Sequence, residues 1–270
     1  MTGTRRGGRL RWLLAIGALV ASGCGGPASS APDPTAGTVV RVAAASDLRF
    51  ALEEVADLVA REDPDVELAV TCGSSGQFVQ QIGNGAPFDL FLSADLAYPE
   101  QLVEEGLAEA DDVFAYGVGR LVLWVGEESP VDPGGGLAAL ADPAVRTVAV
   151  ANPEHAPYGR AAVEALRAAG VWDVVESKLV LGENVSQAAD FVRSGNADAG
   201  VVALSLALAP SAEAEGRWAE VPLELFRPLE QGGVVLAGAR DPAAARAVRD
   251  VLLGEDGRAV LGSYGFSPAD

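Results

Sequence analysis

The sequence predicts an α/β fold in which strands alternate with helices. Apolar runs with strand character at residues 39–43, 66–70 and 88–92 are each followed by apolar residues at helical spacing. Each run leads into a short turn of small or hydroxylated residues before its helix begins. Such alternation is typical of a largely parallel sheet with helices on its faces. Ligands in sheets of this kind bind beyond the carboxyl ends of the strands, which is where these turns fall.

The composition is that of a folded body with one large or two small domains. The chain has 270 residues, of which 49% are hydrophobic and 21% are charged. Its formal net charge of −19 argues against general nucleic-acid binding, which needs a basic surface. An anion bound here would therefore be held by local N–H and O–H dipoles, because the net charge does not attract it.

The first 24 residues are typical of an export signal. Four arginines precede an apolar run at residues 12–20 that is too short to span a bilayer permanently. The Ala-Ser-Gly-Cys sequence that follows resembles the lipobox of a bacterial lipoprotein, in which Cys24 would be the lipidated residue. A plain secretory signal cut nearby is the alternative, and Arg5-Arg6 leaves the twin-arginine and general export routes open. Residues 25–38, rich in Gly, Pro, Ser and Ala, are expected to form a flexible linker.

Three strand–turn–helix units are expected in the first part of the body. The first has Ser46 and Asp47 in its turn, the second has Gly-Ser-Ser-Gly at residues 73–76, and the third has Ser93. The first N–H groups of a helix have no intrahelical partner and lie at the positive end of the helix dipole. A Gly/Ser turn at that position can bind an anion without Lys or Arg, although an ordinary helix cap is the simpler interpretation of any single turn.

A second set of strands and turns follows from residue 119. The turn after one of its strands contains Pro157-Tyr158-Gly159, and the turn after the next contains Val185. A further helix is expected at residues 242–253. Two lobes with facing helix N-termini would close on a small anion by a hinge motion. The expected strands of this set are residues 119–125, 147–151, 178–181, 199–204 and 234–237.

At these residues the chain resembles the periplasmic molybdate-binding proteins, which are the substrate-binding components of molybdate ABC importers. The resemblance covers about residues 40–266, and its most specific segment is the eleven-residue run at residues 85–95, which begins Gly-Ala-Pro-Phe-Asp. The other matching segments are Ala-Ala-Ala-Ser at 43–46, Gly-Ser-Ser-Gly at 73–76 with Gln81-Ile82, Asn-Pro-Glu-His-Ala-Pro-Tyr-Gly at 152–159, Gly-Val-Val-Ala-Leu at 200–204 and Ser-Tyr-Gly-Phe at 263–266.

The resemblance implies a type II periplasmic-binding-protein fold, with two α/β lobes, a hinge and a ligand cleft between the lobes. Residues 39–118 and 233–270 would form lobe 1, and residues 119–232 would form lobe 2. The chain would cross between the lobes near residues 117–119 and 231–233. The implied function is that of a monomeric, extracytoplasmic protein, anchored to the membrane by lipid, that captures molybdate or tungstate and delivers it to the permease of an ABC importer.

The resemblance also implies a site that holds a tetrahedral oxyanion through hydroxyls and amides, with no cation, no resident cofactor and no direct protein ligand to the metal atom. Asp47 would turn its acid side chain away from the ion. Some members place a ligand-binding Tyr where this chain has Ala203, so the fifth contact is open, with the Tyr158 hydroxyl as one candidate. The expected donors are the hydroxyls and amides of Ser46 and Ser75 and the amides of Asp47, Tyr158 and Val185.

The sequence argues against a serine hydrolase, a dinucleotide-binding enzyme and a cysteine metal site. A serine hydrolase would pair a serine of residues 73–76 with His155, the only histidine, but Gln77 stands where the nucleophile-elbow pattern needs Gly. The Gly-Val-Gly at residues 117–119 precedes a strand, whereas a dinucleotide fingerprint precedes a helix. With two cysteines in the chain, a cysteine metal site is untenable. The expectation is a binding protein and not an enzyme, with sulfate, phosphate or an organic anion as the alternative ligand.

Overall fold

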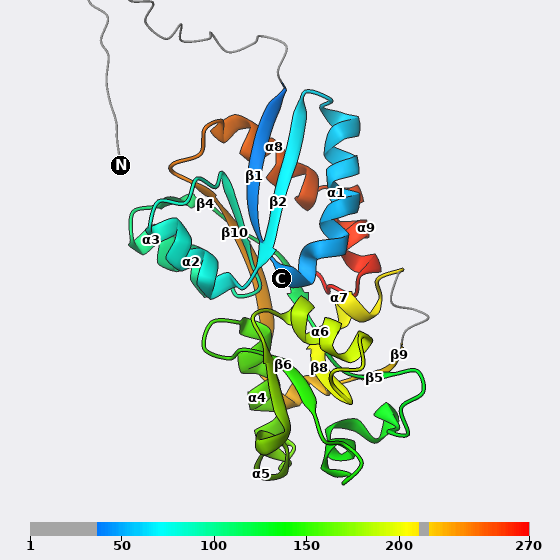
Figure 1. Cartoon of the computed structure of the whole chain (residues 1–270). Coiled ribbons are helices and arrows are strands. Elements are labelled where there is room, and N and C mark those ends of the chain that lie inside the picture. The colour runs from blue at the N-terminus through cyan, green and yellow to red at the C-terminus, as the bar shows by residue number, and fades with distance from the viewer. Residues whose placement is uncertain (1–36, 211–215, 270) are drawn as a thin grey trace, which may run out of the picture. The chain divides into compact units, whose positions relative to one another are not determined.

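The computed structural model describes residues 37–210 and 216–269, and Figure 1 shows how their elements are arranged. These residues belong to one compact unit. The export signal, Cys24 and all but the last two residues of the linker lie outside the described residues.

The first sheet has the strand order β2-β1-β3-β10-β4. Its strand β1 (Thr38–Ala45) pairs in parallel with β2 (Val66–Gly73) on one side and with β3 (Leu90–Ser93) on the other. Strand β10 (Leu229–Leu236) lies antiparallel between β3 and β4 (Ala108–Gly119). This sheet and its helices are called lobe 1 below.

The helices of lobe 1 follow its strands. In α1, Leu52, Val55 and Val59 recur at helical spacing and are buried, whereas the charged residues lie on the other face. The helical elements of this lobe are η1 (Ser46–Leu48), α1 (Arg49–Glu62), α2 (Ser75–Gly83), α3 (Ala97–Glu104), α8 (Pro242–Leu253) and α9 (Glu255–Ser263).

The second sheet has the strand order β7-β6-β8-β5-β9 and forms lobe 2 with its helices. Strand β6 (Val148–Ala151) pairs in parallel with β7 (Leu179–Gly182) and β8 (Ala199–Ala203). Strand β5 (Leu121–Gly126) pairs antiparallel with β8 and β9 (Gly216–Glu220). The helical elements are η2 (Pro133–Ala141), α4 (Pro157–Ala168), α5 (Trp172–Val175), η3 (Glu176–Lys178), α6 (Val185–Arg193), α7 (Leu204–Ala207) and η4 (Leu223–Leu225).

The chain crosses between the lobes on two adjacent segments. Strand β4 ends at Gly119 and β5 begins at Leu121, so one residue separates the two sheets there. The return crossing leads from lobe 2 into β10, where Leu229 pairs with Gly119 and Gln231 pairs with Gly117. The two crossings therefore run side by side, which is the geometry of a hinge. The residue boundaries given to the lobes from the sequence stay a prediction.

The predicted α/β fold is confirmed, but the expectation of a largely parallel sheet is wrong. Half of the strand pairs in each sheet are antiparallel. The antiparallel strands are β10, which arrives from the other lobe, and β5, which continues from β4. Neither is joined to its neighbour through the crossover helix that produces parallel pairing. Strands β4 and β9 and helix α9 were not expected. In β4 the reason is that its first half carries the exposed acidic residues Glu109 and Asp111.

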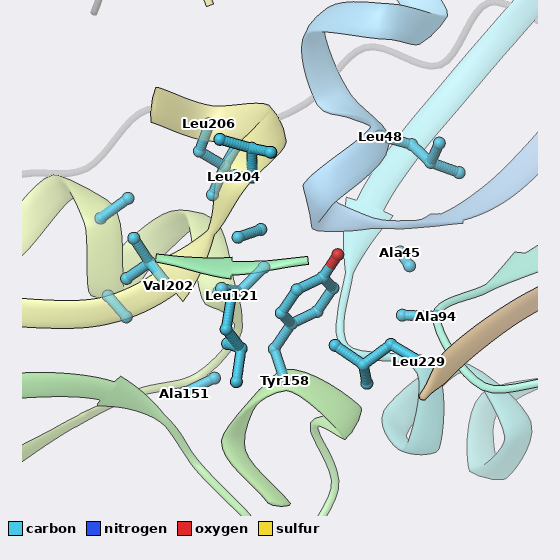
Figure 2. Packing of buried hydrophobic residues seen from close by; sticks show 14 of the residues in the cluster. Ala45, Leu48, Ala94, Leu121, Ala151, Tyr158, Val202, Leu204, Leu206 and Leu229 are labelled. Atoms are coloured by element: carbon cyan, nitrogen blue, oxygen red, sulfur yellow. The ribbon is translucent and has the colours of Figure 1, made fainter. Parts of the chain in front are cut away.

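The apolar core continues from one lobe into the other. Val122, Val201 and Val202 of lobe 2 and Val40 and Val42 of lobe 1 belong to the same cluster of buried residues. Figure 2 shows the ring of Tyr158 between Leu121 and Leu229, with its hydroxyl pointing toward the part of lobe 1 that carries Ala45. The turns at the ends of the strands therefore meet over a packed hinge.

Candidate functional site

The five residues predicted to contact an ion line one pocket between the lobes. Ser46, Asp47 and Ser75 come from lobe 1, and Tyr158 and Val185 come from lobe 2. Each of them is at least 96% buried. The other lining residues are Ala45, Gly73, Ser74, Ala94, Ala156, Pro157 and Asn184.

The hydroxyl groups of Ser46 and Ser75 are oriented to donate. The Ser75 oxygen Oγ accepts a hydrogen bond of 3.1 Å from the amide of Ala94. The Ser46 oxygen Oγ accepts one of 3.3 Å from the amide of Ser186, which crosses between the lobes. A hydroxyl carries one hydrogen. Because an amide already occupies a lone pair of each oxygen, the hydrogens of these two hydroxyls are left to donate to a ligand.

The pocket is also lined by the first residues of three helices. Ser75 begins α2, Tyr158 is the second residue of α4, and Val185 begins α6. Within residues 37–210 and 216–269, no group accepts a hydrogen bond from the amides of these three residues. N–H groups in the first turn have no intrahelical partner, and the positive ends of the helix dipoles favour an anion there. The side chain of Asn184 caps α6 by accepting from Gln187 at 3.1 Å, so the Val185 amide stays open to the pocket.

No basic side chain lines the pocket. Asp47 is the one charged residue among its lining residues. In the described part of the chain, no three His, Cys, Asp or Glu residues are placed to hold a metal ion. The arrangement can therefore bind an anion through hydroxyl and amide dipoles, and among the described residues it lacks the clustered ligand side chains that a bare cation would need.

The Asp47 side chain is directed to the hinge strand β10. The side-chain amide of Gln231 donates to its oxygen Oδ2 at 2.7 Å and to the Tyr158 hydroxyl at 3.1 Å. The Tyr116 hydroxyl, on β4, lies 2.9 Å from Gln231 Oε1 and 2.8 Å from the carbonyl oxygen of Ser93. Gln231 thus joins a turn of each lobe to both hinge strands.

This network restricts the residue at position 119. A Cβ atom at Gly119 would collide with the Tyr158 hydroxyl and with the Gln231 amide, so the hinge has room only for Gly there. Ala203, where a ligand-binding Tyr was considered, is fully buried at the end of β8. The hydroxyl of Tyr158 accepts from Gln231 and also forms a hydrogen bond with the Asp47 side chain, so the amide of Tyr158 is the group that this residue has left for a ligand.

Burial shifts the protonation of these groups. Burial raises the pKa of Asp47 to about 6, although the hydrogen bond from Gln231 opposes that shift. The pKa values of Tyr116 and Tyr158 are raised well above the usual value for Tyr, by burial and by the neighbouring Asp47 charge. Both tyrosines are therefore neutral donors or acceptors at any physiological pH.

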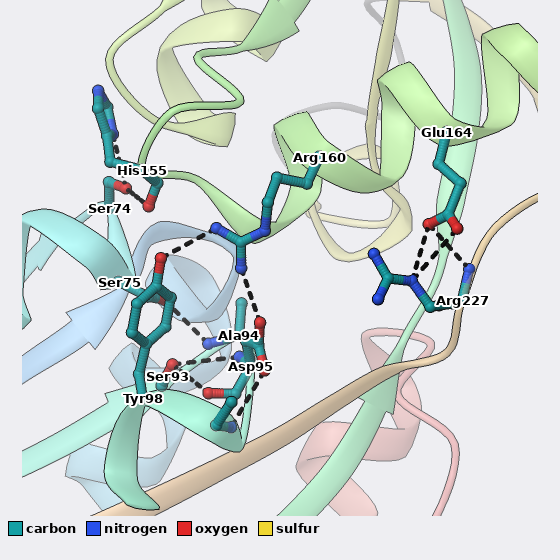
Figure 3. A network of polar contacts seen from close by, with 11 residues as sticks. Ser74, Ser75, Ser93, Ala94, Asp95, Tyr98, His155, Arg160, Glu164 and Arg227 are labelled. Atoms are coloured by element: carbon teal, nitrogen blue, oxygen red, sulfur yellow. Dashed lines mark hydrogen bonds and ion pairs between the residues drawn. The ribbon is translucent and has the colours of Figure 1, made fainter. Parts of the chain in front are cut away.

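Hydrogen bonds close the cleft around the pocket. The Ser74 hydroxyl donates to the carbonyl oxygen of His155 at 2.6 Å, and the guanidinium of Arg160 donates to Tyr98 at 2.9 Å and to Asp95 at 2.7 Å (Figure 3). All of these bonds join lobe 1 to lobe 2. The structure is therefore a closed arrangement of the two lobes.

Two more hydrogen bonds join the lobes at the turn that contains Ser46 and Asp47. The Ser186 hydroxyl donates to the carbonyl oxygen of Ser46 at 2.8 Å, and the Ser205 hydroxyl donates to that of Asp47 at 2.8 Å. Both hydroxyls belong to lobe 2 and are buried. They fix the main chain of the first turn in the closed arrangement.

Ser74 and His155 are the residue types of a nucleophile and a general base in a serine hydrolase. The ring nitrogen Nδ1 lies 2.9 Å from Ser74 Oγ. Because the Ser74 hydroxyl donates its hydrogen to the His155 carbonyl, Nδ1 must carry the hydrogen of the second bond. A general base would need a free lone pair at that nitrogen. This pair therefore closes the cleft and is not arranged to activate a nucleophile.

The sequence and fold of this chain are similar to those of known binding proteins. Residues 40–267 match the family model of the bacterial extracellular solute-binding proteins. The chain belongs to this family. The molybdate-binding protein ModA of Azotobacter vinelandii is 38% identical over 84% of this chain and 89% of its own length. ModA of Rhodobacter capsulatus is 41% identical over 72% of this chain and 75% of its own length.

A further relative and a solved structure agree with this family. The Bacillus subtilis protein YvgL, provisionally assigned as an ABC transporter substrate-binding lipoprotein, is 33% identical over 68% of this chain and 69% of its own length. The periplasmic molybdate-binding protein of Azotobacter vinelandii superposes with a TM-score of 0.80, at 31% identity, over 86% of this chain and all of that one. The two-lobe fold expected of this solute-binding protein is thus confirmed.

The sequence did not reveal every residue around the pocket. Gln231 and Tyr116 lie within strands, where a polar residue gives no local signal of its partner. Ser205 follows Ala203 by two residues, and only the packing of α7 shows that it reaches the first turn. Ser186 stands in the turn that was identified, so its position could be predicted although its partner could not.

Proposed function

We propose that this solute-binding protein captures molybdate or tungstate between its lobes and delivers the ion, as a monomer, to the permease of an ABC importer. The observation that carries the proposal is the set of donors without a cation. The hydroxyls of Ser46 and Ser75 and the amides of Ser75, Tyr158 and Val185 meet in one pocket from both lobes. Two relatives are named for molybdate binding, and a solved periplasmic molybdate-binding protein has the same overall fold.

The donors suit a fully deprotonated tetrahedral dianion. A hydrogen bond to a charged group contributes about 1.5–3 kcal/mol net, and each ~1.4 kcal/mol is a tenfold change in affinity. Five to seven such donors, less the costs of dehydration and closure, support submicromolar affinity or better. An amide of Asp47 would add a donor from the first turn. With an ion bound, the spacing of these donors would then favour molybdate and tungstate over the smaller sulfate.

We also propose that Cys24 is the lipid-anchored residue of the mature protein. The Ala-Ser-Gly-Cys sequence after the apolar run supports this, as does the provisional assignment of one relative as a lipoprotein. No helix of the described residues is long and apolar enough to cross a membrane. Labelled palmitate should be incorporated by the wild-type protein in cells and lost in Cys24→Ala, whereas retained label would refute the anchor.

The ligand can be tested by calorimetry with four ions in parallel. Molybdate, tungstate, sulfate and phosphate are titrated into the soluble protein without its signal and linker. Heat of binding with molybdate or tungstate and none with phosphate would support the proposal. If sulfate, phosphate or an organic anion binds and molybdate does not, that anion is the ligand and the proposal is wrong.

A further inference from the structure

Asp47 places a negative charge in a pocket that is otherwise suited to an anion. Asp47 is one of the residues that line the pocket, and it is 1% exposed. Oxygen Oδ2 accepts from Gln231, but oxygen Oδ1 is buried and has no hydrogen-bond partner within the described residues. A buried carboxylate oxygen without a donor is costly, so this atom is one that a proton would stabilise.

The groups around Asp47 do not neutralise its charge. Tyr158 of α4, Tyr116 of β4 and Cys72 of β2 are the titratable residues whose protonation is coupled to it, and all three are neutral at pH 7. Gln231 of β10 is uncharged, and Ser205 of α7 contacts only the main chain of Asp47. Arg49 and Glu53 of α1 lie close enough to influence Cys72, and neither forms an ion pair with Asp47 in the described part of the chain.

The negative charge of Asp47 would oppose binding of the proposed ligand. A dianion in the same pocket would meet a carboxylate across a water-poor gap, where like charges repel strongly. Resting on the proposed function, we infer that Asp47 takes up one proton from solvent when the dianion binds, and that the complex holds a neutral carboxyl group. The proton is added at Oδ1 and comes from the buffer acid, whose conjugate base remains in solution.

The pH range of this uptake follows from the closed arrangement without the ion. Burial there raises the pKa of Asp47 to about 6, so Asp47 is roughly nine-tenths ionised at pH 7 in that arrangement. The bound ion raises that pKa further, so binding at pH 7 should take up about 0.9 proton per ion. Because the complex binds more protons than the free protein, affinity should fall about tenfold for each pH unit above 7.

His155 is a second ionisable side chain beside the pocket. Its ring contacts Ser74 at 2.9 Å and lies 3.8 Å from the exposed carboxylate of Glu183. Because this ring also lies at the cleft, the experiment separates the two residues. The variants are Asp47→Asn, which keeps the shape of the side chain, and His155→Gln, which keeps a polar group at the cleft.

The test is calorimetry of molybdate binding at pH 7 in two buffers with different enthalpies of ionisation. The difference between the measured heats gives the number of protons taken up. We expect about 0.9 in the wild type, close to zero in Asp47→Asn with binding retained, and about 0.9 in His155→Gln. Affinity of Asp47→Asn should be nearly constant from pH 6.5 to 8.5.

Each other outcome has a definite meaning. If molybdate binds to the wild type without proton uptake, the inference is wrong and the proposed function stands. Uptake that persists in Asp47→Asn and disappears in His155→Gln assigns the proton to the histidine and overturns the inference as well. If none of molybdate and tungstate binds, the proposed function itself has failed. Should Asp47→Asn not fold, a difference infrared spectrum of the wild type must show a new protonated carboxyl band on binding, and its absence would refute the inference.

Discussion

Gln231 donates a 2.7 Å hydrogen bond to the buried carboxylate of Asp47 and so ties the hinge to the turn that begins the binding pocket. The same side-chain amide donates to the hydroxyl of Tyr158, which lies in the first turn of α4 in lobe 2. A residue in a hinge strand therefore connects the two walls of the pocket. Contacts of this kind bridge the lobes only when they are closed, so they contribute to the closing equilibrium and hence to the apparent affinity.

Replacing Gln231 by Leu should weaken both the fold and ligand binding. The substitution leaves Oδ2 of Asp47 without its donor and removes one hydrogen bond each from the hydroxyls of Tyr116 and Tyr158, at about 1–3 kcal/mol for each buried group left unsatisfied. We expect the free energy of unfolding in urea to fall by about 2–4 kcal/mol and molybdate affinity to fall at least tenfold. Gln101→Leu is the matched control, because Gln101 bonds only to Glu105 on the exposed face of α3. Equal effects of the two substitutions would show that the hinge network has no special role.

Ser75→Ala should weaken molybdate binding by about tenfold or more while leaving the protein folded. The Ser75 hydroxyl accepts from Ala94 and has its hydrogen left for the ion. Dissociation constants from calorimetry, compared with melting temperatures in the absence of ligand, separate the two roles. Ser194→Ala removes an exposed hydroxyl that bonds only near the end of α6 and should change neither value much. Unchanged affinity in Ser75→Ala would mean that Ser75 serves only the start of its helix.

Asp47→Asn should change stability in a pH-dependent way. The folded pKa of about 6 exceeds the unfolded value of about 3.9, so the folded state binds more protons between these values. Stability of the wild type therefore declines as pH rises from about 4 to 6, by up to about 3 kcal/mol at 1.36 kcal/mol per unit. The variant loses this penalty, and in unfolding titrations it should exceed the wild type at pH 7.5 and match it at pH 4.

Asp89 serves as a control because its pKa is shifted in the opposite direction to that of Asp47. Burial alone would raise its pKa, but hydrogen bonds from Arg41 and from the amide of Arg240 lower it below the usual value. A carboxylate of this kind stabilises the fold above its unfolded pKa, and that stability is lost as pH falls through its folded pKa. Asp89→Asn should therefore destabilise the protein at pH 7.5, where Asp47→Asn stabilises it. The same direction of change in both variants at that pH would contradict the assigned pKa shifts.

Arg160→Gln should speed the release of the ion. Arg160 joins the lobes through Asp95 and Tyr98, and the charged pair is about one-third exposed, so its contribution is screened. A loss of roughly 0.2–1 kcal/mol corresponds to a dissociation rate up to about fivefold higher in stopped-flow measurements. Arg227→Gln is the control, since Arg227 pairs with Glu164 within lobe 2. A release rate as slow as that of the wild type would show that this bridge does not hold the closed state.

Much of the fold was accessible from the sequence because each local pattern agreed with its tertiary setting. The strand before Ser46 is apolar and wholly buried in its second half, and the helix after it has a regular apolar face. The turns at Ser75, Tyr158 and Val185 could be identified because small and polar residues follow strands there. Antiparallel pairing of β5 and β10 could not be predicted, since the direction of a strand within a sheet depends on the hinge and not on local residues.

The polar contacts of the site were less accessible for a related reason. Gln231 is 184 positions from Asp47 in the sequence, and Ser205 is 158 positions from it. Nothing in either local sequence shows such a partner. Asp47 itself was expected to turn its acid side chain away from the ion, and the structure shows why that side chain has a stable place: an amide of the hinge strand holds one of its oxygens.

Calorimetric titration of the protein with molybdate is the measurement that tests the account most directly. The donor set predicts binding of one molybdate per chain with a dissociation constant below about 1 μM, similar binding of tungstate, weaker binding of sulfate and no binding of phosphate. The absence of heat with both molybdate and tungstate, together with binding of another solute, would contradict the account.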